Sequence, residues 1–286
     1  MPARFDKLEG STRSLADAVA AELAGAAPLG VAYSGGVDSA LLLALAVRAL
    51  GPENVVALLG VSPSLARSER RLAHETAAFI GARVVEIETH EGESPDYVKN
   101  DVDRCFFCKD ELFARISDEV VAAHRLAAVA YGENADDARR PDRPGSQAAT
   151  NHRVLRPLSV AGLTKSQVRE VARVIELPVA DKPAAPCLAS RIPHGQAVTP
   201  EKLRQVERAE EVLRELGFTD GRVRHHGDIA RIELPTAEIA RAGQDDVREA
   251  LHRGVGAAGF RFVVVDLRGI QSGAFTLPLL QVGTRG

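Results

Sequence analysis

The residues best suited to chemistry form one short run, Ser34-Gly35-Gly36-Val37-Asp38-Ser39. An apolar, strand-like segment precedes the run and an apolar helical pattern follows it, so the run is predicted to join a strand to a helix. The two glycines let the backbone approach an anion closely, and the start of the helix offers unpaired N–H groups. Ser34 and Ser39 add hydroxyl donors, while Asp38 adds a carboxylate that can hold Mg²⁺ beside a phosphate. The run is neither a Walker loop nor a GxGxxG motif, so it predicts a phosphate site of another class; an ordinary turn that binds nothing is the alternative.

The three cysteines form a second candidate site. Cys105 and Cys108 lie in Arg104-Cys-Phe-Phe-Cys-Lys109, and Cys187 lies far along the chain. Three thiolates suit a 4Fe-4S cluster with one open iron, or a zinc ion with a fourth ligand such as histidine. Arg104 and Lys109 are expected to stabilise thiolates and cluster charge. Burial as small hydrophobic residues is the alternative, whereas a thioredoxin-type pair is not favoured because a polar stretch precedes Cys105.

The elements that position these residues alternate between strands and helices over the first 175 or so residues. Helices are predicted at 12–25, from the glycine run to about 49, at 68–80, at 109–124 and after Thr164, where Gln167 completes a capping box. Strands are predicted at 29–33, 54–60, 83–87, 126–131 and 154–158. This alternation indicates an α/β fold with a parallel sheet and right-handed crossovers. Ligands bind at the carboxyl ends of such strands, where the glycine run lies.

The C-terminal part has a different pattern. Residues 178–200 are rich in proline and are predicted to be a linker that also carries function. Beyond them we expect a helix at 200–216, a hairpin of strands 221–226 and 229–234, a helix at 243–253 and a strand at 260–267. The predicted domains are therefore residues 1–190, with the parallel sheet, and residues 191–286, a smaller α+β domain.

Alternation along the hairpin places Arg222, Arg224, Arg231 and Glu233 on one face. With Gly227-Asp228 as the turn, Arg222 faces Glu233 and Arg224 faces Arg231. Two opposed arginines destabilise a hairpin unless a carboxylate or another anion lies between them, so the face is either a solvated charged surface or a phosphate or carboxylate clamp. Glu210 lies on the apolar stripe of the preceding helix, and a hairpin arginine is its expected partner.

The composition sets limits on the class of protein. The chain has 286 residues, 45% of them hydrophobic and 26% charged, and a formal charge of −3. These values are typical of a globular protein without a dominant nucleic-acid-binding surface. We see no signal core and no run long enough to span a membrane, and an odd number of cysteines fits a reducing compartment, so a cytoplasmic location is expected.

The run at 34–39 resembles the PP-loop of the N-type ATP pyrophosphatases, and the chain from about residue 10 to 275 resembles the LarE family of ATP-dependent sulfur transferases. The resemblance is carried by SGGVDS at 34–39, RCFFCK at 104–109, YGENADD at 131–137, LRPLSVAGLTKSQVR at 155–169, PCLASRIPHG at 186–195 and RVRHHGDIARIE at 222–233. It implies that ATP adenylylates a carboxylate of pyridinium-3,5-dicarboxylate mononucleotide and releases pyrophosphate. Sulfur then displaces AMP to give a thiocarboxylate, in nickel-pincer nucleotide synthesis.

The resemblance also implies roles for individual residues. Cys187 matches the sulfur-bearing position, and together with Cys105 and Cys108 it matches members that hold a 4Fe-4S cluster; sacrificial loss of the Cys187 sulfur is the alternative. Arg222, Arg224, Glu233 and Glu210 match positions around the substrate phosphate, with Arg191 and Arg268 as further candidates. Asp38 and Asp137 match positions that meet Mg²⁺, and Lys165 matches one that meets phosphates. Gly60, Val61, Ser62 and Gly132 stand where the adenine and ribose of ATP are expected.

The family resemblance further implies a homo-oligomer, a hexamer, that takes its sulfur from sulfide or another donor. Three other functions stay open from the sequence. A PP-loop tRNA thiolase would also combine these motifs, although the net charge and the lack of a basic tail disfavour RNA binding. An amide-forming synthetase would leave the cysteines incidental, and an adenine-nucleotide sensor with a structural zinc would not be an enzyme.

Overall fold

The computed structural model describes residues 3–139 and 144–271, and the chain forms two compact units. The first unit comprises residues 1–91 and 105–185, and the second comprises residues 92–104 and 186–286. Residues 92–104 thus belong with the C-terminal part of the chain. The predicted domain boundary between residues 190 and 191 stays a prediction, and residues 272–286 of that domain lie outside the described residues.

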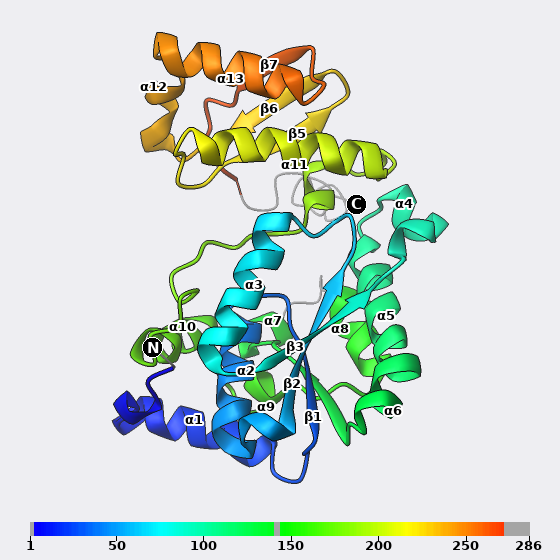
Figure 1. Ribbon diagram of the computed structural model, residues 1–286, viewed down its shortest axis with the longest axis vertical. Helices are drawn as coiled ribbons and strands as arrows, with labels where there is room; N and C mark the ends of the chain where they lie inside the picture. Colours follow the sequence, from blue (N-terminus) through cyan, green and yellow to red (C-terminus); the bar gives the residue numbers. More distant parts are fainter. Residues whose placement is uncertain (1–2, 140–143, 272–286) are drawn as a thin grey trace, which may run out of the picture. The chain divides into compact units, whose positions relative to one another are not determined.

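The first unit is built on a four-stranded sheet, and Figure 1 shows its strands side by side. Its strands are β1 (Leu29–Ala32), β2 (Val55–Val61), β3 (Arg83–Glu88) and β4 (Ala128–Tyr131), in the order β3-β2-β1-β4. All neighbouring pairs are parallel, with Leu29 paired to both Val55 and Ala128. The predicted α/β class with a parallel sheet is therefore confirmed.

The predicted strand at 154–158 is wrong. Leu155 makes an isolated parallel bridge to Ala130, and helix α9 (Pro157–Val160) begins two residues later. Proline has no backbone N–H to donate to a sheet ladder, but its fixed φ suits the first turn of a helix. Pro157 therefore ends the extended segment.

Helices cover both faces of this sheet, which gives two separate cores. One core lies under α1 (Gly10–Glu22), α2 (Val37–Leu50), α3 (Arg67–Ile80) and α10 (Lys165–Val174). The other lies under α5 (Arg104–Arg115) and α8 (Pro144–Asn151); the predicted helix at 109–124 begins earlier and is divided by a π-helical turn (Ile116–Val120) before α6 (Val121–His124). Residues 39–47 of α2 are all buried, as expected for a helix that is apolar on every side.

The second unit contains a three-stranded sheet in the order β5-β6-β7. Its strands are β5 (Arg222–His226), β6 (Ile229–Glu233) and β7 (Phe262–Val265), and its helices are α4 (Pro95–Lys99), α11 (Pro200–Glu215), α12 (Ile239–Ala242) and α13 (Asp245–Ala257). Strands β5 and β6 are antiparallel, whereas β7 is parallel to β6 and is reached through α12 and α13. Residues of α11 and α13 pack with Val223 and Ile232 to form the core of this unit.

Asn100 attaches residues 92–104 to the second unit. It follows α4 in the left-handed conformation, is fully buried, and its side-chain amide donates to the carbonyls of Ile192, Pro193 and Gln196 at 3.2, 2.8 and 3.0 Å. Asparagine tolerates this backbone conformation better than most residues. One side chain thereby connects α4 to the loop that follows Cys187.

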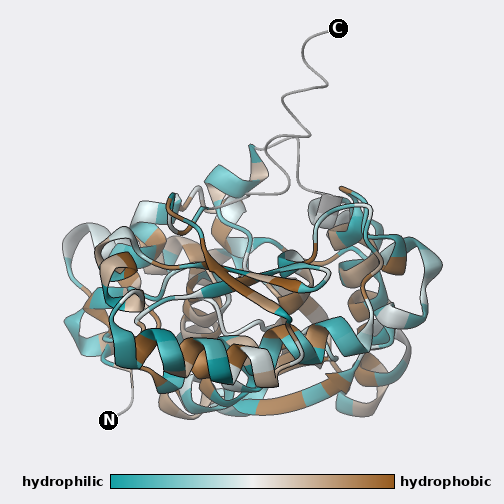
Figure 2. Cartoon of the chain, turned by 90° about the horizontal axis from the view of Figure 1, so that it is seen from above, coloured by the Kyte–Doolittle hydropathy of each residue, from teal (hydrophilic) through white to brown (hydrophobic). Residues whose placement is uncertain are grey.

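Helices α3 and α11 bury mainly apolar residues and expose polar ones, and Figure 2 shows hydrophilic and hydrophobic residues alternating along the outer helices. No helix within residues 3–139 and 144–271 is long and apolar enough to cross a membrane.

Candidate functional site

The glycine run forms a tight turn between β1 and α2, as the sequence predicted. Gly35 has a φ of +72°, and a Cβ there would lie 2.9 Å from the Ala73 Cβ of α3, so both the conformation and the packing require glycine. Gly36 is the N-cap of α2 and makes no side-chain capping bond. The first N–H groups of this fourteen-residue helix therefore have no capping side chain, which is the arrangement that binds anions.

The two serine hydroxyls of the run differ in their surroundings. Ser39 is buried, accepts a hydrogen bond from the Ser34 N–H at 3.2 Å and donates to the Gly36 carbonyl at 3.0 Å. Ser34 is exposed, with its hydroxyl 3.2 Å from that of Ser39. Ser39 thus fixes the shape of the turn, while Ser34 is the exposed serine of the run.

Asp38 and Asp137, the two residues predicted to meet Mg²⁺, are bound to the same side-chain amide. The Asn134 Nδ2 donates to Asp38 Oδ1 and to Asp137 Oδ2, in both cases at 2.9 Å. The Asn134 Oδ1 caps helix α7 (Ala135–Ala138) by accepting from two backbone N–H groups. Asp38 Oδ2 also forms an ion pair with Lys165. Carboxylate oxygens are the ligands that Mg²⁺ prefers, so this donor set fits the ion.

Gly132 permits the close approach between β4 and α2 on which this arrangement depends. A Cβ at Gly132 would lie 2.6 Å from the Ser39 nitrogen and 2.8 Å from the Asp38 carbonyl carbon. Both atoms belong to the backbone of the glycine run and have little freedom to move. The placement of Gly132 near the adenine and ribose of ATP stays a prediction; the contact that the structure shows is with the glycine run itself.

Three of the residues predicted near the adenine lie at the carboxyl end of β2: Gly60 and Val61 are its last two residues and Ser62 follows it. A Cβ at Gly60 would lie 3.0 Å from Leu112 of α5, and the Ser62 hydroxyl donates to Glu91. Glu91 is 3% exposed, and its Oε2 has no hydrogen-bond partner among the described residues. This buried carboxylate was not predicted, because nothing in the residues around Glu91 distinguishes it from a surface glutamate.

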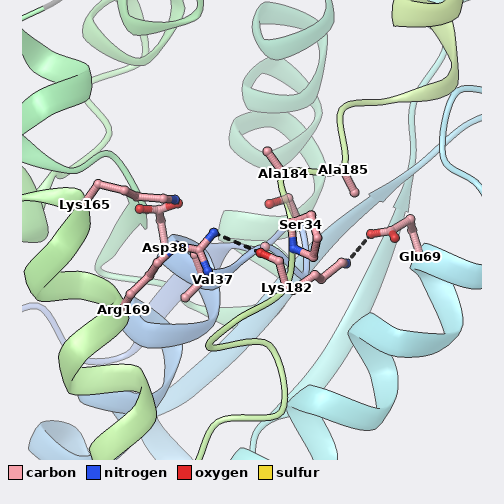
Figure 3. Close-up of a pocket in the computed structure, with 11 residues that line it drawn as sticks. Ser34, Val37, Asp38, Glu69, Lys165, Arg169, Lys182, Ala184 and Ala185 are labelled. Atoms are coloured by element: carbon pink, nitrogen blue, oxygen red, sulfur yellow. Dashed lines mark hydrogen bonds and ion pairs between the residues drawn. The ribbon is translucent and has the colours of Figure 1, made fainter. Parts of the chain in front are cut away.

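A pocket of about 170 Å³ opens beside the glycine run, and Figure 3 shows its lining. Asp38 lies at its wall together with Glu69 from α3, Lys165 and Arg169 from α10, and Lys182 from the segment after α10. Glu69, Arg169 and Lys182 were not predicted from the sequence. Lys165 and Arg169 lie four residues apart on one helical face, and this spacing of two cations is the signal that would have identified Arg169.

The three cysteines are divided between the two units. Cys105 is exposed and Cys108 half-buried, one turn apart on α5 in the first unit, whereas Cys187 is exposed in the second unit as the N-cap of a 3₁₀ turn. Side chains three residues apart on a helix lie close together, so the α5 pair is compatible with binding one metal centre. The structure describes no group of three or more potential metal ligands within residues 3–139 and 144–271.

The two cations beside the cysteine pair make contacts of their own. Arg104 is buried and donates to the Asn100 side chain and, at 3.0 Å, to the Ala189 carbonyl. The Lys109 ammonium lies 4.7 Å from the centre of the Tyr131 ring. Their predicted role as counter-charges for thiolates stays a prediction.

The predicted hairpin register of the second unit is confirmed residue by residue. Arg222 pairs with Glu233 and Arg224 with Arg231 across β5 and β6, while Val223 and Ile232 point into the core. The carboxylate expected between the opposed arginines is that of Glu233, which lies 2.8 Å from Arg224 and 3.2 Å from Arg231. The protein itself thus supplies the anion that this pair of arginines requires.

Glu210 is buried as expected, but its predicted partner is wrong. Its carboxylate accepts from Arg191 at 2.7 and 3.2 Å and from the Val223 N–H at 3.0 Å. Arg191 is itself buried; although burial alone lowers its pKa, the charge of Glu210 and its hydrogen bonds raise that pKa above the ordinary value. Arg191 comes from the proline-rich segment directly after Cys187, so this buried ion pair attaches the cysteine loop to α11.

The remaining candidates of this unit lie near the same strands. Arg224 donates to the carbonyls of Ser190 and Gln271 at 2.9 and 3.2 Å, and burial lowers the pKa of Arg222. Arg268 is exposed and its backbone N–H donates to Asp266. Arg191, Arg222 and Arg224 therefore gather beside the loop that carries Cys187, with two buried carboxylates among them.

Comparison with known proteins gives related sequences over most of the chain. The asparagine synthase family model matches residues 11–130. The pyridinium-3,5-bisthiocarboxylic acid mononucleotide synthase of Lactiplantibacillus plantarum is 36% identical over 258 residues, which cover 89% of this chain and 91% of that enzyme. An uncharacterized protein of Synechocystis is 42% identical over 243 residues, or 85% of this chain and 90% of its own. An uncharacterized protein of Methanocaldococcus jannaschii is 28% identical over 204 residues, which cover 71% of this chain and 76% of that protein.

Proposed function

Because the chain belongs to the LarE family of PP-loop proteins, we propose that it is an ATP-dependent sulfur transferase that acts on pyridinium-3,5-dicarboxylate mononucleotide. In the proposed reaction a substrate carboxylate attacks the α-phosphorus of ATP, and the bond to the β-phosphate breaks to release pyrophosphate. Sulfide sulfur then attacks the acyl carbon of the adenylate, and AMP leaves with the bonding electron pair. A carboxylate does not react with sulfide until one of its oxygens becomes a good leaving group, so activation must come first.

The observation that carries this proposal is the arrangement around the glycine run in the first unit. The uncapped start of α2 offers N–H groups to the leaving pyrophosphate, and Ser34 offers a hydroxyl. Asp38 and Asp137, bound by the Asn134 amide, would hold Mg²⁺, which when bound neutralises charge on the phosphates. Lys165, next to Asp38, is available to phosphate oxygens once the metal takes that carboxylate.

The arginine cluster of the second unit supports the substrate side of the proposal. Guanidinium groups bind phosphates through paired hydrogen bonds, and Arg222 and Arg224 lie on the hairpin face predicted for the phosphate of the mononucleotide. Glu210 and Glu233 hold Arg191 and Arg224 in fixed orientations. We assign these carboxylates a positioning role for that reason.

For the sulfur step we propose that Cys105, Cys108 and Cys187 hold a 4Fe-4S cluster whose open iron carries the sulfide. Two of the three thiols are one helical turn apart on α5, and Cys187 is exposed at the start of a turn. The alternative is that Cys187 gives up its own sulfur and ends as dehydroalanine. Mass spectrometry of Cys187 after turnover separates the two: loss of H₂S from this residue supports the sacrificial route, and an intact residue together with iron–sulfur absorbance supports the cluster.

The test of the activation step is release of pyrophosphate from ATP that depends on the pyridinium substrate. We expect release by the wild-type protein and a loss of about 100-fold or more in the Asp38→Asn variant, which removes the charge that would hold Mg²⁺. A tRNA thiolase would instead release pyrophosphate on addition of tRNA, and an amide-forming enzyme would release it with ammonia and with all three cysteines replaced. The homo-oligomeric state expected from the family is a separate proposal, and the molar mass in solution tests it.

A further inference from the structure

The segment that follows α10 forms one wall of the phosphate pocket; we call residues 180–185 the strap. Lys182, Pro183, Ala184 and Ala185 line the pocket together with Ser34 and Asp38, and Figure 3 labels Lys182, Ala184 and Ala185 among the lining residues. Arg169 holds the strap in place, because its guanidinium donates to the carbonyl of Ala180 at 2.6 Å and to that of Lys182 at 2.9 Å. The strap is therefore part of the pocket by its contacts as well as by its position.

The Lys182 side chain is only 16% exposed and its ammonium forms an ion pair with Glu69 of α3, whose side chain is 27% exposed. The pocket thus holds two such pairs, Lys182–Glu69 and Lys165–Asp38, together with Arg169. Arg169 is bound to neutral carbonyls and forms no ion pair with a carboxylate among the described residues, so its positive charge is not neutralised there. The three cations exceed the two carboxylates by one positive charge. The pocket therefore suits an anion with more than one negative charge, such as a polyphosphate, which can compete with the carboxylates for the cations.

We propose that Lys182 binds the β- and γ-phosphates of ATP and that Glu69 holds its ammonium only while the nucleotide is absent. This inference rests on the proposed ATP-dependent function and adds to it a residue and an exchange of partners. A lysine ammonium on a flexible stem can turn from one acceptor to another, whereas the planar group of Arg169 is committed to two carbonyls. Glu69 lies in the first turn of α3, where the helix dipole stabilises a carboxylate that has lost its cation.

The test is calorimetric binding of ATP, inorganic pyrophosphate and AMP, each with Mg²⁺, to four proteins: wild type, Lys182→Met, Glu69→Gln and the double variant. Lys182→Met is expected to weaken binding of ATP and pyrophosphate by about 10- to 100-fold, the loss typical of one hydrogen bond between charged groups, and to leave AMP unchanged. Glu69→Gln is expected to raise the affinity for ATP about 2- to 10-fold, because the change releases the Lys182 ammonium and removes a negative charge from the pocket. In the double variant that gain is absent.

A matched control is Lys7→Met, which removes a lysine from an exposed ion pair with Glu176 and should change no affinity. If the Lys182–Glu69 ion pair instead persists when ATP is bound, both single variants lower the affinity for ATP to the same extent, and that result overturns the inference. If Lys182→Met lowers the affinities for AMP and for ATP by the same factor, the inference is also overturned, because Lys182 would then contact the α-phosphate. If the wild type binds ATP and Lys182→Met binds it equally well, this inference alone fails. If the wild type binds no ATP, the proposed function fails and the inference falls with it.

Discussion

Replacement of Gly132 by alanine tests whether the contact between β4 and α2 shapes the phosphate site. The added Cβ would lie 2.6 Å from the Ser39 nitrogen and 2.8 Å from the Asp38 carbonyl carbon, whereas ordinary contact begins at 3.4 Å. The two backbone segments must separate by about 0.8 Å, the difference between 2.6 and 3.4 Å. Forcing an extra carbon into a close-packed site costs about 1–3 kcal/mol.

Because the displaced atoms belong to the glycine run itself, the cost is expected to appear in nucleotide binding as well as in folding. We predict that Gly132→Ala lowers the affinity for ATP about 5- to 150-fold, which is the change in dissociation constant that corresponds to about 1–3 kcal/mol. The same change is expected to lower the melting temperature. The measurement is calorimetric ATP binding with Mg²⁺, together with thermal unfolding followed by circular dichroism. Gly256→Ala is the control: Gly256 lies within α13, and no atom apart from the adjacent residues and the helix's own backbone lies within 4 Å of the added Cβ. Wild-type affinity and melting temperature in Gly132→Ala would refute the reasoning.

Two further predictions concern the second unit. Arg191→Met leaves the Glu210 carboxylate buried without its cation, which is expected to lower the free energy of unfolding by about 3–5 kcal/mol; an unchanged denaturant midpoint would contradict this. Burial, followed by the charge of Lys202, lowers the pKa of His225, so the unfolded chain takes up a proton first as the pH falls below about 6.5. The stability of the wild type should therefore decline from that pH downward and that of His225→Gln less steeply; parallel profiles would contradict the assignment.

Local patterns in the sequence predicted local structure well. The capping box of Thr164 and Gln167 is present at the start of α10, and the hairpin around Gly227 has the register that a two-residue turn requires. Both follow from residues within a few positions of one another. The strand expected at 154–158 failed for an equally local reason, because Pro157 begins a helix.

Contacts between distant parts of the chain could not be predicted in the same way. The periodicity of α11 identified Glu210 as a buried carboxylate that needs a cationic partner. From the sequence alone Arg191 and a hairpin arginine are equally suitable partners, and the structure shows that Arg191 is the partner. The Lys182–Glu69 pair joins residues 113 positions apart, and neither side chain has a local signal. The sequence therefore identified Glu210 as a group that requires a partner, while the fold decides which residue supplies that partner.

The most direct test of the account is the release of pyrophosphate from Mg-ATP by the purified protein with pyridinium-3,5-dicarboxylate mononucleotide. The account predicts release that requires this acid, that is lost in Asp38→Asn, and that persists in Cys187→Ala, because activation of the carboxylate precedes arrival of sulfur. Absence of substrate-dependent pyrophosphate from the wild type, with ATP bound, would contradict the central claim.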